Sequence, residues 1–145
     1  DDVVMGQPVS IRFALGFALG ALAPLYVEAA NWAEIFRAPS GLRVLADIDG
    51  IPRTRVTSLR IWLKYDFAEM DPSTAKGEIA SMLLRFEISC VPSPASRAVR
   101  EVSYDKFGQV LSDASYERAM TEPIPDSILE DVLRTLCRFA LKGKS

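Results

Sequence analysis

The stretch Val56–Phe67 reads VTSLRIWLKYDF, and its side chains alternate between apolar and polar. The apolar face would hold Leu59, Ile61, Leu63, Tyr65 and Phe67, and the polar face Arg60, Trp62, Lys64 and Asp66. A period of two over this length predicts a half-buried strand of an antiparallel sheet. Trp62 is the exception on the polar face. Its ring is expected to cover neighbouring aliphatic stems, and the alternative is a partner-binding aromatic.

Five more segments around this strand carry strand-like patterns. We expect strands at 31–37, 42–49, 78–90, 97–104 and 109–113. Turn-forming residues separate them, including Asp49-Gly50 and the sequence DKFG, whose Gly108 can take a positive φ. The sequence therefore predicts about six antiparallel strands.

The C-terminal segment changes to a helical period. Asp126 or Ser127 is expected to cap a helix, and Ser127 with Glu130 fits a capping box. The apolar stripe at helical spacing is Ile128, Leu129, Val132, Leu133, Leu136 and Cys137. From Phe139 to Ser145 we expect a frayed tail. The predicted fold class is α+β, an antiparallel sheet with a C-terminal helix packed on it.

Two cysteines, Cys90 and Cys137, are present. Cys90 falls on the inward side of a strand, and Cys137 falls on the apolar stripe of the helix. A disulfide between them would link the helix to the sheet and would stabilise the fold by roughly 4 kcal/mol. Two buried free thiols are the alternative, but an exported chain favours pairing.

The first 29 residues have the order of a secretory signal peptide. Arg12 precedes the uncharged run FALGFALGALAPLYV, and Val27-Glu28-Ala29 has compact residues at the cleavage positions. The run is shorter than the ~20 residues that span a bilayer. An uncleaved anchor and a buried helix are the alternatives. If the leader is retained, we expect residues 10–27 to be a helical or disordered extension that adds no core.

This organisation predicts cleavage after Ala29, a domain over residues 30–140 and a tail over 141–145. No cysteine ends the apolar run, so lipid attachment is not expected. The predicted location is periplasmic or secreted, with no membrane span after cleavage. Without the leader, sixteen acidic and sixteen basic side chains remain, which argues against nucleic acid and against electrostatic membrane docking.

Little in the sequence points to catalysis. Histidine is absent, which removes the commonest general base and metal ligand, and paired cysteines leave no thiolate. A carboxylate pair could still act as acid and base, and the nearest candidates are Asp47, Asp49, Asp66, Glu69 and Asp71. Asp47 and Asp49 are interpreted as solvated turn residues. The loop that holds Glu69 and Asp71 could bind calcium, but it lacks the EF-hand pattern. Glycine-rich phosphate loops are also missing. We therefore expect no enzyme, no cofactor and no metal.

A local basic-aromatic cluster is the candidate partner patch. It consists of Arg53, Arg55, Arg60 and Trp62. Such a cluster suits an anionic partner surface, and a solvated strand face is the alternative.

The residues from Trp32 to Cys137 resemble the surface-adhesin protein E family of Gram-negative bacteria. The resemblance is carried by Asn31-Trp32, by Asp47, Ile51, Arg53, Ile61-Trp62 and Asp66-Phe67 in the segment LADIDGIPRTRVTSLRIWLKYDF, by RFEISC, by Tyr104 and Gly108, and by Pro125, Ile128, Leu133 and Cys137. It implies a six-stranded antiparallel sheet with the helix tied to it by Cys90–Cys137.

The family is typified by an outer-membrane lipoprotein that binds host matrix and serum proteins and can dimerise. The resemblance therefore implies an exported, non-enzymatic binding module with protein partners and a possible homodimer. Two alternatives stand beside it: a periplasmic structural component that acts as a homo-oligomer, and a small-ligand binder.

Overall fold

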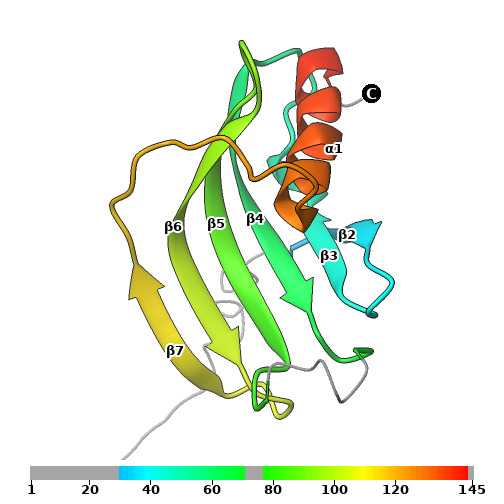
Figure 1. Cartoon of the computed structure of the whole chain (residues 1–145), viewed down its shortest axis with the longest axis vertical. Coiled ribbons are helices and arrows are strands. Elements are labelled where there is room, and N and C mark those ends of the chain that lie inside the picture. The colour runs from blue at the N-terminus through cyan, green and yellow to red at the C-terminus, as the bar shows by residue number, and fades with distance from the viewer. Residues whose placement is uncertain (1–29, 71–76, 144–145) are drawn as a thin grey trace, which may run out of the picture. The chain divides into compact units, whose positions relative to one another are not determined.

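Six strands and one helix make up the domain in the computed structural model, which describes residues 30–70 and 77–143 (Figure 1). The elements are β2 (Trp32–Arg37), β3 (Arg43–Asp47), β4 (Ser58–Asp66), β5 (Ser81–Ser89), β6 (Ala95–Tyr104), β7 (Val110–Ser115) and α1 (Ile128–Lys142). The strands form one antiparallel sheet in the order β2-β3-β4-β5-β6-β7, so each strand pairs with the one that precedes it in the chain. The predicted fold class is confirmed.

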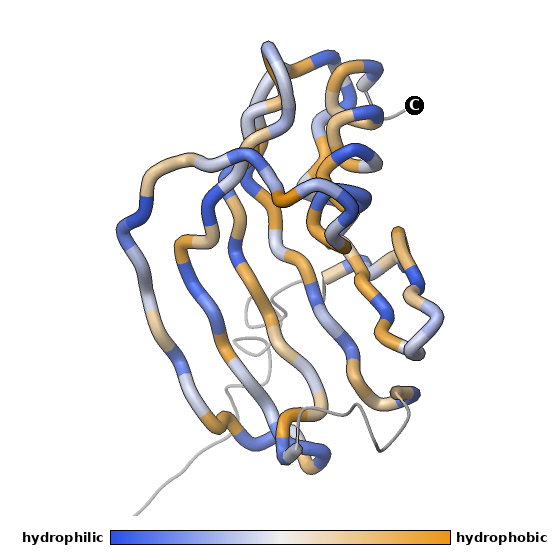
Figure 2. The backbone as a smooth tube through the Cα atoms, viewed as in Figure 1, coloured by the Kyte–Doolittle hydropathy of each residue, from blue (hydrophilic) through white to orange (hydrophobic). Residues whose placement is uncertain are grey.

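Strand β4 lies in the middle of the sheet and shows the alternation that its sequence predicts. Ile61 and Leu63 are buried on the face toward α1 and are paired across the strand with Phe86 and Leu84 of β5. Figure 2 shows hydrophobic residues recurring along the strands in the same way. This face of β4 and β5 therefore forms the floor of the core.

Helix α1 packs on part of the core side of the sheet and does not reach β7 (Figure 1). Val132, Leu133, Leu136 and Ala140 are all 0% exposed and belong to the same cluster as the buried strand residues. Burial of a leucine side chain contributes about 1.5–3 kcal/mol, so this stripe is a main source of stability. In isolation a helix of 15 residues is marginal in water, and packing on the sheet stabilises it.

The predicted disulfide is confirmed. Cys90 follows β5 directly, and its backbone N–H donates to the carbonyl of Thr57 over 2.8 Å. It is bonded to Cys137, 47 residues later, with a Cα–Cα distance of 5.5 Å. Both cysteines are buried, so the bond joins the end of a central strand to the inner side of the helix.

The helix begins as predicted but ends later. Ser127 is the N-cap, and its Oγ accepts from the N–H of Glu130 over 3.1 Å. The frayed tail expected from Phe139 is wrong, because the helix continues to Lys142. Its last turn is held by the buried Ala140, whose carbonyl accepts from the N–H of Val56 over 2.9 Å.

The β3 segment is shorter than expected. Residues Ile48–Gly50 form a single 3-10 turn instead of extending the strand to residue 49. Asp47 caps this turn with its side chain, which accepts from the N–H of Asp49 over 3.3 Å. The chain is thereby redirected toward β4.

Some predictions concern residues outside the described ranges. They are the signal peptide with its cleavage after Ala29 and the retained-leader extension over 10–27. In the part of the chain that the structure describes, no helix is long and apolar enough to cross a membrane.

Candidate partner-binding surface

The face of the sheet opposite α1 carries rows of arginine that run across the strands. Arg60 of β4 lies beside Glu87 of β5, which lies beside Arg97 of β6. In the next row Trp62, Arg85 and Arg100 are neighbours in the same three strands. We call this surface the arginine face and define it by Arg60, Trp62, Arg85, Arg97 and Arg100.

Glu87 holds two of these arginines in place. It lies 2.6 Å from a guanidinium nitrogen of Arg60 and 2.6 Å from one of Arg97. Arg97 also donates to the carbonyl of Arg118 over 3.1 Å. The hydrogen bond from Arg97 holds the pKa of Glu87 below its ordinary value, and Arg60 adds to the effect. The carboxylate is therefore ionised at neutral pH, and both guanidiniums are oriented.

The second row combines an aromatic ring with further ion pairing. The guanidinium of Arg85 lies 5.4 Å from the centre of the Trp62 ring, a cation–π distance. Arg100 makes two hydrogen bonds to Asp113 of β7, over 3.1 and 2.8 Å. The Trp62 ring therefore lies beside a guanidinium that is not paired with a carboxylate within the described residues.

The arginine face is positively charged overall. Three of its four guanidiniums, those of Arg60, Arg97 and Arg100, are paired with the two carboxylates of Glu87 and Asp113, and the fourth, that of Arg85, lies over the Trp62 ring. Two hollows, of about 470 and 410 Å³, share Glu87 and Arg97 in their lining. Tyr116 and Arg118 line the second hollow, and the Arg118 guanidinium stacks 4.0 Å from the Tyr116 ring centre. The surface is therefore shallow and cationic, and aromatic rings lie among its cations.

The structure separates the four residues of the predicted patch into two places. Arg60 and Trp62 lie on the arginine face. Arg53 and Arg55 lie in the connector before β4, which is hydrogen-bonded to the C-terminal end of α1. The sequence analysis did not identify Arg85, Arg97 and Arg100. The pairing register of three strands brings them beside Arg60 and Trp62, and the sequence of a single strand does not determine that register.

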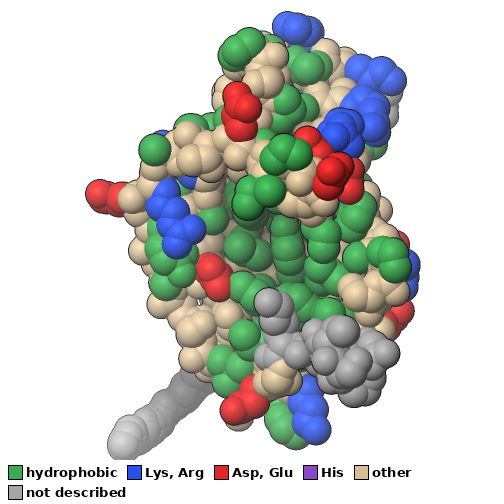
Figure 3. Space-filling model, in the orientation of Figure 1, with side chains coloured by type: hydrophobic (Ala, Val, Ile, Leu, Met, Phe, Trp, Pro, Cys, Tyr) green, Lys and Arg blue, Asp and Glu red, His purple; other side chains and the backbone are tan. Residues whose placement is uncertain are grey.

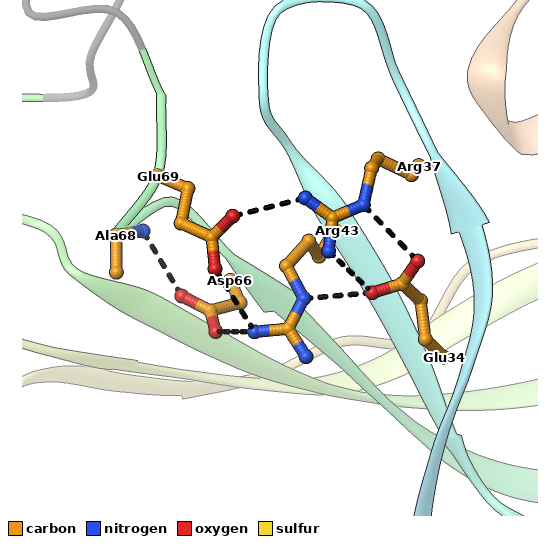
Figure 4. Close-up of polar contacts among 6 residues, drawn as sticks. All are labelled: Glu34, Arg37, Arg43, Asp66, Ala68 and Glu69. Atoms are coloured by element: carbon orange, nitrogen blue, oxygen red, sulfur yellow. Dashed lines mark hydrogen bonds and ion pairs between the residues drawn. The ribbon is translucent and has the colours of Figure 1, made fainter.

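The carboxylates considered for acid–base chemistry near β4 form an ion-pair network instead (Figure 4). Arg37 pairs with Glu34 and with Glu69, each over 2.9 Å. Arg43 pairs with Glu34 over 2.8 Å and with Asp66 over 3.1 Å. The network ties the β2–β3 hairpin to the end of β4.

The other carboxylates in that group have structural positions or are not described. Asp47 caps the 3-10 turn, and Asp71 lies outside the described residues. Within residues 30–70 and 77–143, no three acidic or cysteine side chains gather closely enough to hold a metal ion.

We expect the stability of the domain to fall as the pH drops below about 4.5. Hydrogen bonds from arginine lower the pKa values of Glu34, Glu87 and Asp113 from ordinary values of 4.5, 4.5 and 3.8. Because the folded-state pKa values are depressed, their contribution is complete above the ordinary values and is lost as the pH falls through the folded values. Urea midpoints measured from pH 7 to pH 3 test this.

The matched variant for that titration is Glu87→Gln. It removes the carboxylate that Arg60 and Arg97 share, so its midpoint should fall less between pH 5 and pH 3 than that of the unmodified chain. An unchanged slope would contradict a contribution from this pair.

Figure 3 views the face that carries α1. Hydrophobic side chains line a hollow beside the helix, and Lys and Arg side chains gather over its C-terminal half. This face therefore differs from the arginine face, where the cations are interleaved with carboxylates and rings.

Comparison with known families agrees with this architecture. The model of the family described as Surface-adhesin protein E matches residues 32–138, which cover all six strands and most of α1. Comparison with curated proteins and with solved structures found no significant match. With the family matched over most of the chain, and with the sheet, helix and disulfide in place, the chain belongs to the surface-adhesin protein E family.

Proposed function

We propose that this protein is an exported, non-enzymatic module of the bacterial envelope that binds other proteins through the arginine face. Membership of an adhesin family supports an extracytoplasmic binding role. The observation that carries the proposal is the pair of cross-strand rows that bring Arg60, Arg97 and Arg100, each held by a carboxylate, to the same face as Trp62 and Arg85. The Cys90–Cys137 bond is consistent with an oxidising compartment.

The composition of this face suits protein recognition. Arginine and tryptophan are the residue types that most often dominate binding energy at protein interfaces. Here the arginines are held by Glu87 and Asp113 before any partner arrives, which reduces the entropy lost on binding. The excess of positive charge favours a partner with acidic side chains.

A binding screen tests the function itself. The full chain is immobilised and exposed to laminin, vitronectin, plasminogen and envelope extracts from a Gram-negative bacterium. We expect at least one protein to bind at micromolar concentration with an affinity that falls as salt rises. The proposal is dropped if none does.

Truncation of the central aromatic residue should then weaken binding strongly. We expect Trp62→Ala to reduce the affinity for the captured partner about 30-fold, the size typical of a hot-spot aromatic. The matched control is Phe107→Ala, because Phe107 is 77% exposed in the β6–β7 turn, away from the arginine face. Equal affinities for Trp62→Ala and the unmodified chain would place the interface elsewhere.

A homo-oligomeric structural role is the second candidate, and the edge strand β7 favours it. Val110 and Leu111 of β7 are 58% and 42% exposed, and β7 forms one edge of the sheet. An exposed apolar edge is a template for strand pairing with a second copy. Analytical ultracentrifugation of the unmodified chain and of the Leu111→Lys variant tests this role. A dimer that the substitution dissociates would favour it.

A further inference from the structure

Two segments that are far apart in the sequence bring four cations to one end of the domain. Arg53 and Arg55 come from the connector before β4, and Arg138 and Lys142 come from the end of α1. The hydrogen bond from Val56 to Ala140 holds the two segments together. Gly143 packs so closely on the connector that a Cβ there would overlap the backbone of Arg53. We call these four residues the helix-end cluster.

The helix-end cluster differs from the other cations of the domain in its pairing. All four side chains are exposed, and none has a hydrogen bond or ion pair within the described residues. Arg134, one turn earlier on the helix, is paired with Asp131 over 2.9 Å and with Glu130 over 3.3 Å. The surplus positive charge therefore begins after Arg134 and is concentrated at the end of α1, where Figure 3 shows Lys and Arg side chains together.

An apolar side chain accompanies this charge. Phe139 is 42% exposed although it lies between Arg138 and the buried Ala140. Arg138 and Lys142 are four residues apart, so they project from the same side of the helix about 6 Å apart. The end of the domain thus presents an aromatic ring beside cations on long, flexible stems.

We propose that the helix-end cluster and Phe139 form a docking surface for an anionic lipid bilayer. The balance of acidic and basic residues after residue 29 argues against docking by the net charge of the domain, but attraction to a charged surface acts over a Debye length of about 8 Å, so a local excess of four cations can dock. Cations near a membrane surface with an aromatic residue between them are the usual composition of an interfacial anchor. Arginine guanidiniums also match phosphate oxygens bidentately.

The lack of partners in the cluster favours a bilayer over an acidic protein. On the arginine face, Glu87 and Asp113 fix the guanidiniums for specific recognition. In the helix-end cluster no described carboxylate orients the cations, which suits a surface whose phosphates are mobile and not fixed in one arrangement. This surface is distinct from the arginine face, and the proposal does not depend on protein binding there.

A local fluorescence probe tests the docking in the full chain. An environment-sensitive dye is attached at Phe139→Cys in one sample and at Phe107→Cys in another, after folding, with the native disulfide verified by mass. Phe107 lies beside Lys106, and the Lys106 Nζ is 5.2 Å from the centre of the Phe107 ring. Position 107 is therefore a matched control for position 139, because it also combines an aromatic ring with a cation. Figure 1 shows that its turn, between β6 and β7, is at the far end of the sheet from the end of α1.

We expect the dye at position 139, but not at 107, to shift to the blue with vesicles of 30% phosphatidylglycerol in phosphatidylcholine. The shift should disappear at 0.5 M NaCl. Arg53→Gln/Arg55→Gln/Arg138→Gln should lower the docking constant about 100-fold, since each basic residue near an anionic membrane contributes about 1 kcal/mol. Arg37→Gln/Lys64→Gln/Lys106→Gln, which removes the same charge outside both the helix-end cluster and the arginine face, should not change it.

The same experiment can overturn the proposal. An equal response of both dyes, a full response with pure phosphatidylcholine, or equal losses in the two triple variants would each contradict an anionic-lipid surface at this end. A response at position 139 to polyglutamate but not to vesicles would assign the cluster to an acidic protein instead.

Discussion

Replacing both Cys90 and Cys137 by alanine is expected to lower the free energy of unfolding by about 4 kcal/mol. The bond closes a loop of 47 residues, and opening it returns the chain entropy of that loop to the unfolded state. A loss of this size is a large part of the total stability of a domain, which is usually about 5–15 kcal/mol. The loss is measured by urea unfolding of the full chain and of the double variant under oxidising conditions.

The control is the unmodified chain under reducing conditions. Reduction should lower its urea midpoint nearly as far as the double substitution, and the Cys90→Ala/Cys137→Ala chain should not respond to reductant. Equal midpoints for the oxidised chain and the double variant would show that the bond does not stabilise the fold.

Leu133→Ala is expected to cost about 3 kcal/mol of stability, in the usual range for a fully buried leucine. Leu133 is 0% exposed on the inner stripe of α1 and belongs to the core that the helix shares with the sheet. Its removal leaves a cavity between the two layers. The cost is measured by urea unfolding with the disulfide intact.

Leu111→Ala is the matched control for this substitution. Leu111 is 42% exposed on β7 and has no place in the buried cluster, so the same truncation should change stability by no more than about 0.5 kcal/mol. Similar losses in the two variants would contradict the packing of α1 on the sheet.

The local patterns of the sequence predict most of this fold. Alternation in Val56–Phe67 predicts β4 and its buried face, and the helical stripe through Leu133 predicts the inner side of α1. Cys90 and Cys137 fall on the buried sides of a neighbouring strand and of the helix, and the expected export to an oxidising compartment favours their pairing over two free thiols. These features depend on neighbours within one element, and a single sequence contains that information.

The candidate surface depends on contacts between elements, and the sequence predicts it only in part. Arg60 and Trp62 are two residues apart and share a strand face by alternation alone. Arg85, Arg97 and Arg100 join them through the pairing register of β4, β5 and β6, which no segment encodes by itself.

The end of the helix shows the same limit. From the sequence we expect fraying from Phe139 onward. The structure keeps Ala140 buried because its carbonyl accepts from Val56, a residue 84 positions earlier in the chain. The same contact moves Arg53 and Arg55 away from Trp62 and beside the end of α1.

We propose that the face of the sheet opposite α1 binds a protein partner. Hydroxyl-radical footprinting of the full chain, alone and with the partner captured in the screen, tests it most directly. We expect oxidation of Trp62 to fall in the complex while oxidation of Phe107 and Phe139 stays the same. Unchanged oxidation of Trp62, with protection at Phe107 or Phe139, would contradict it.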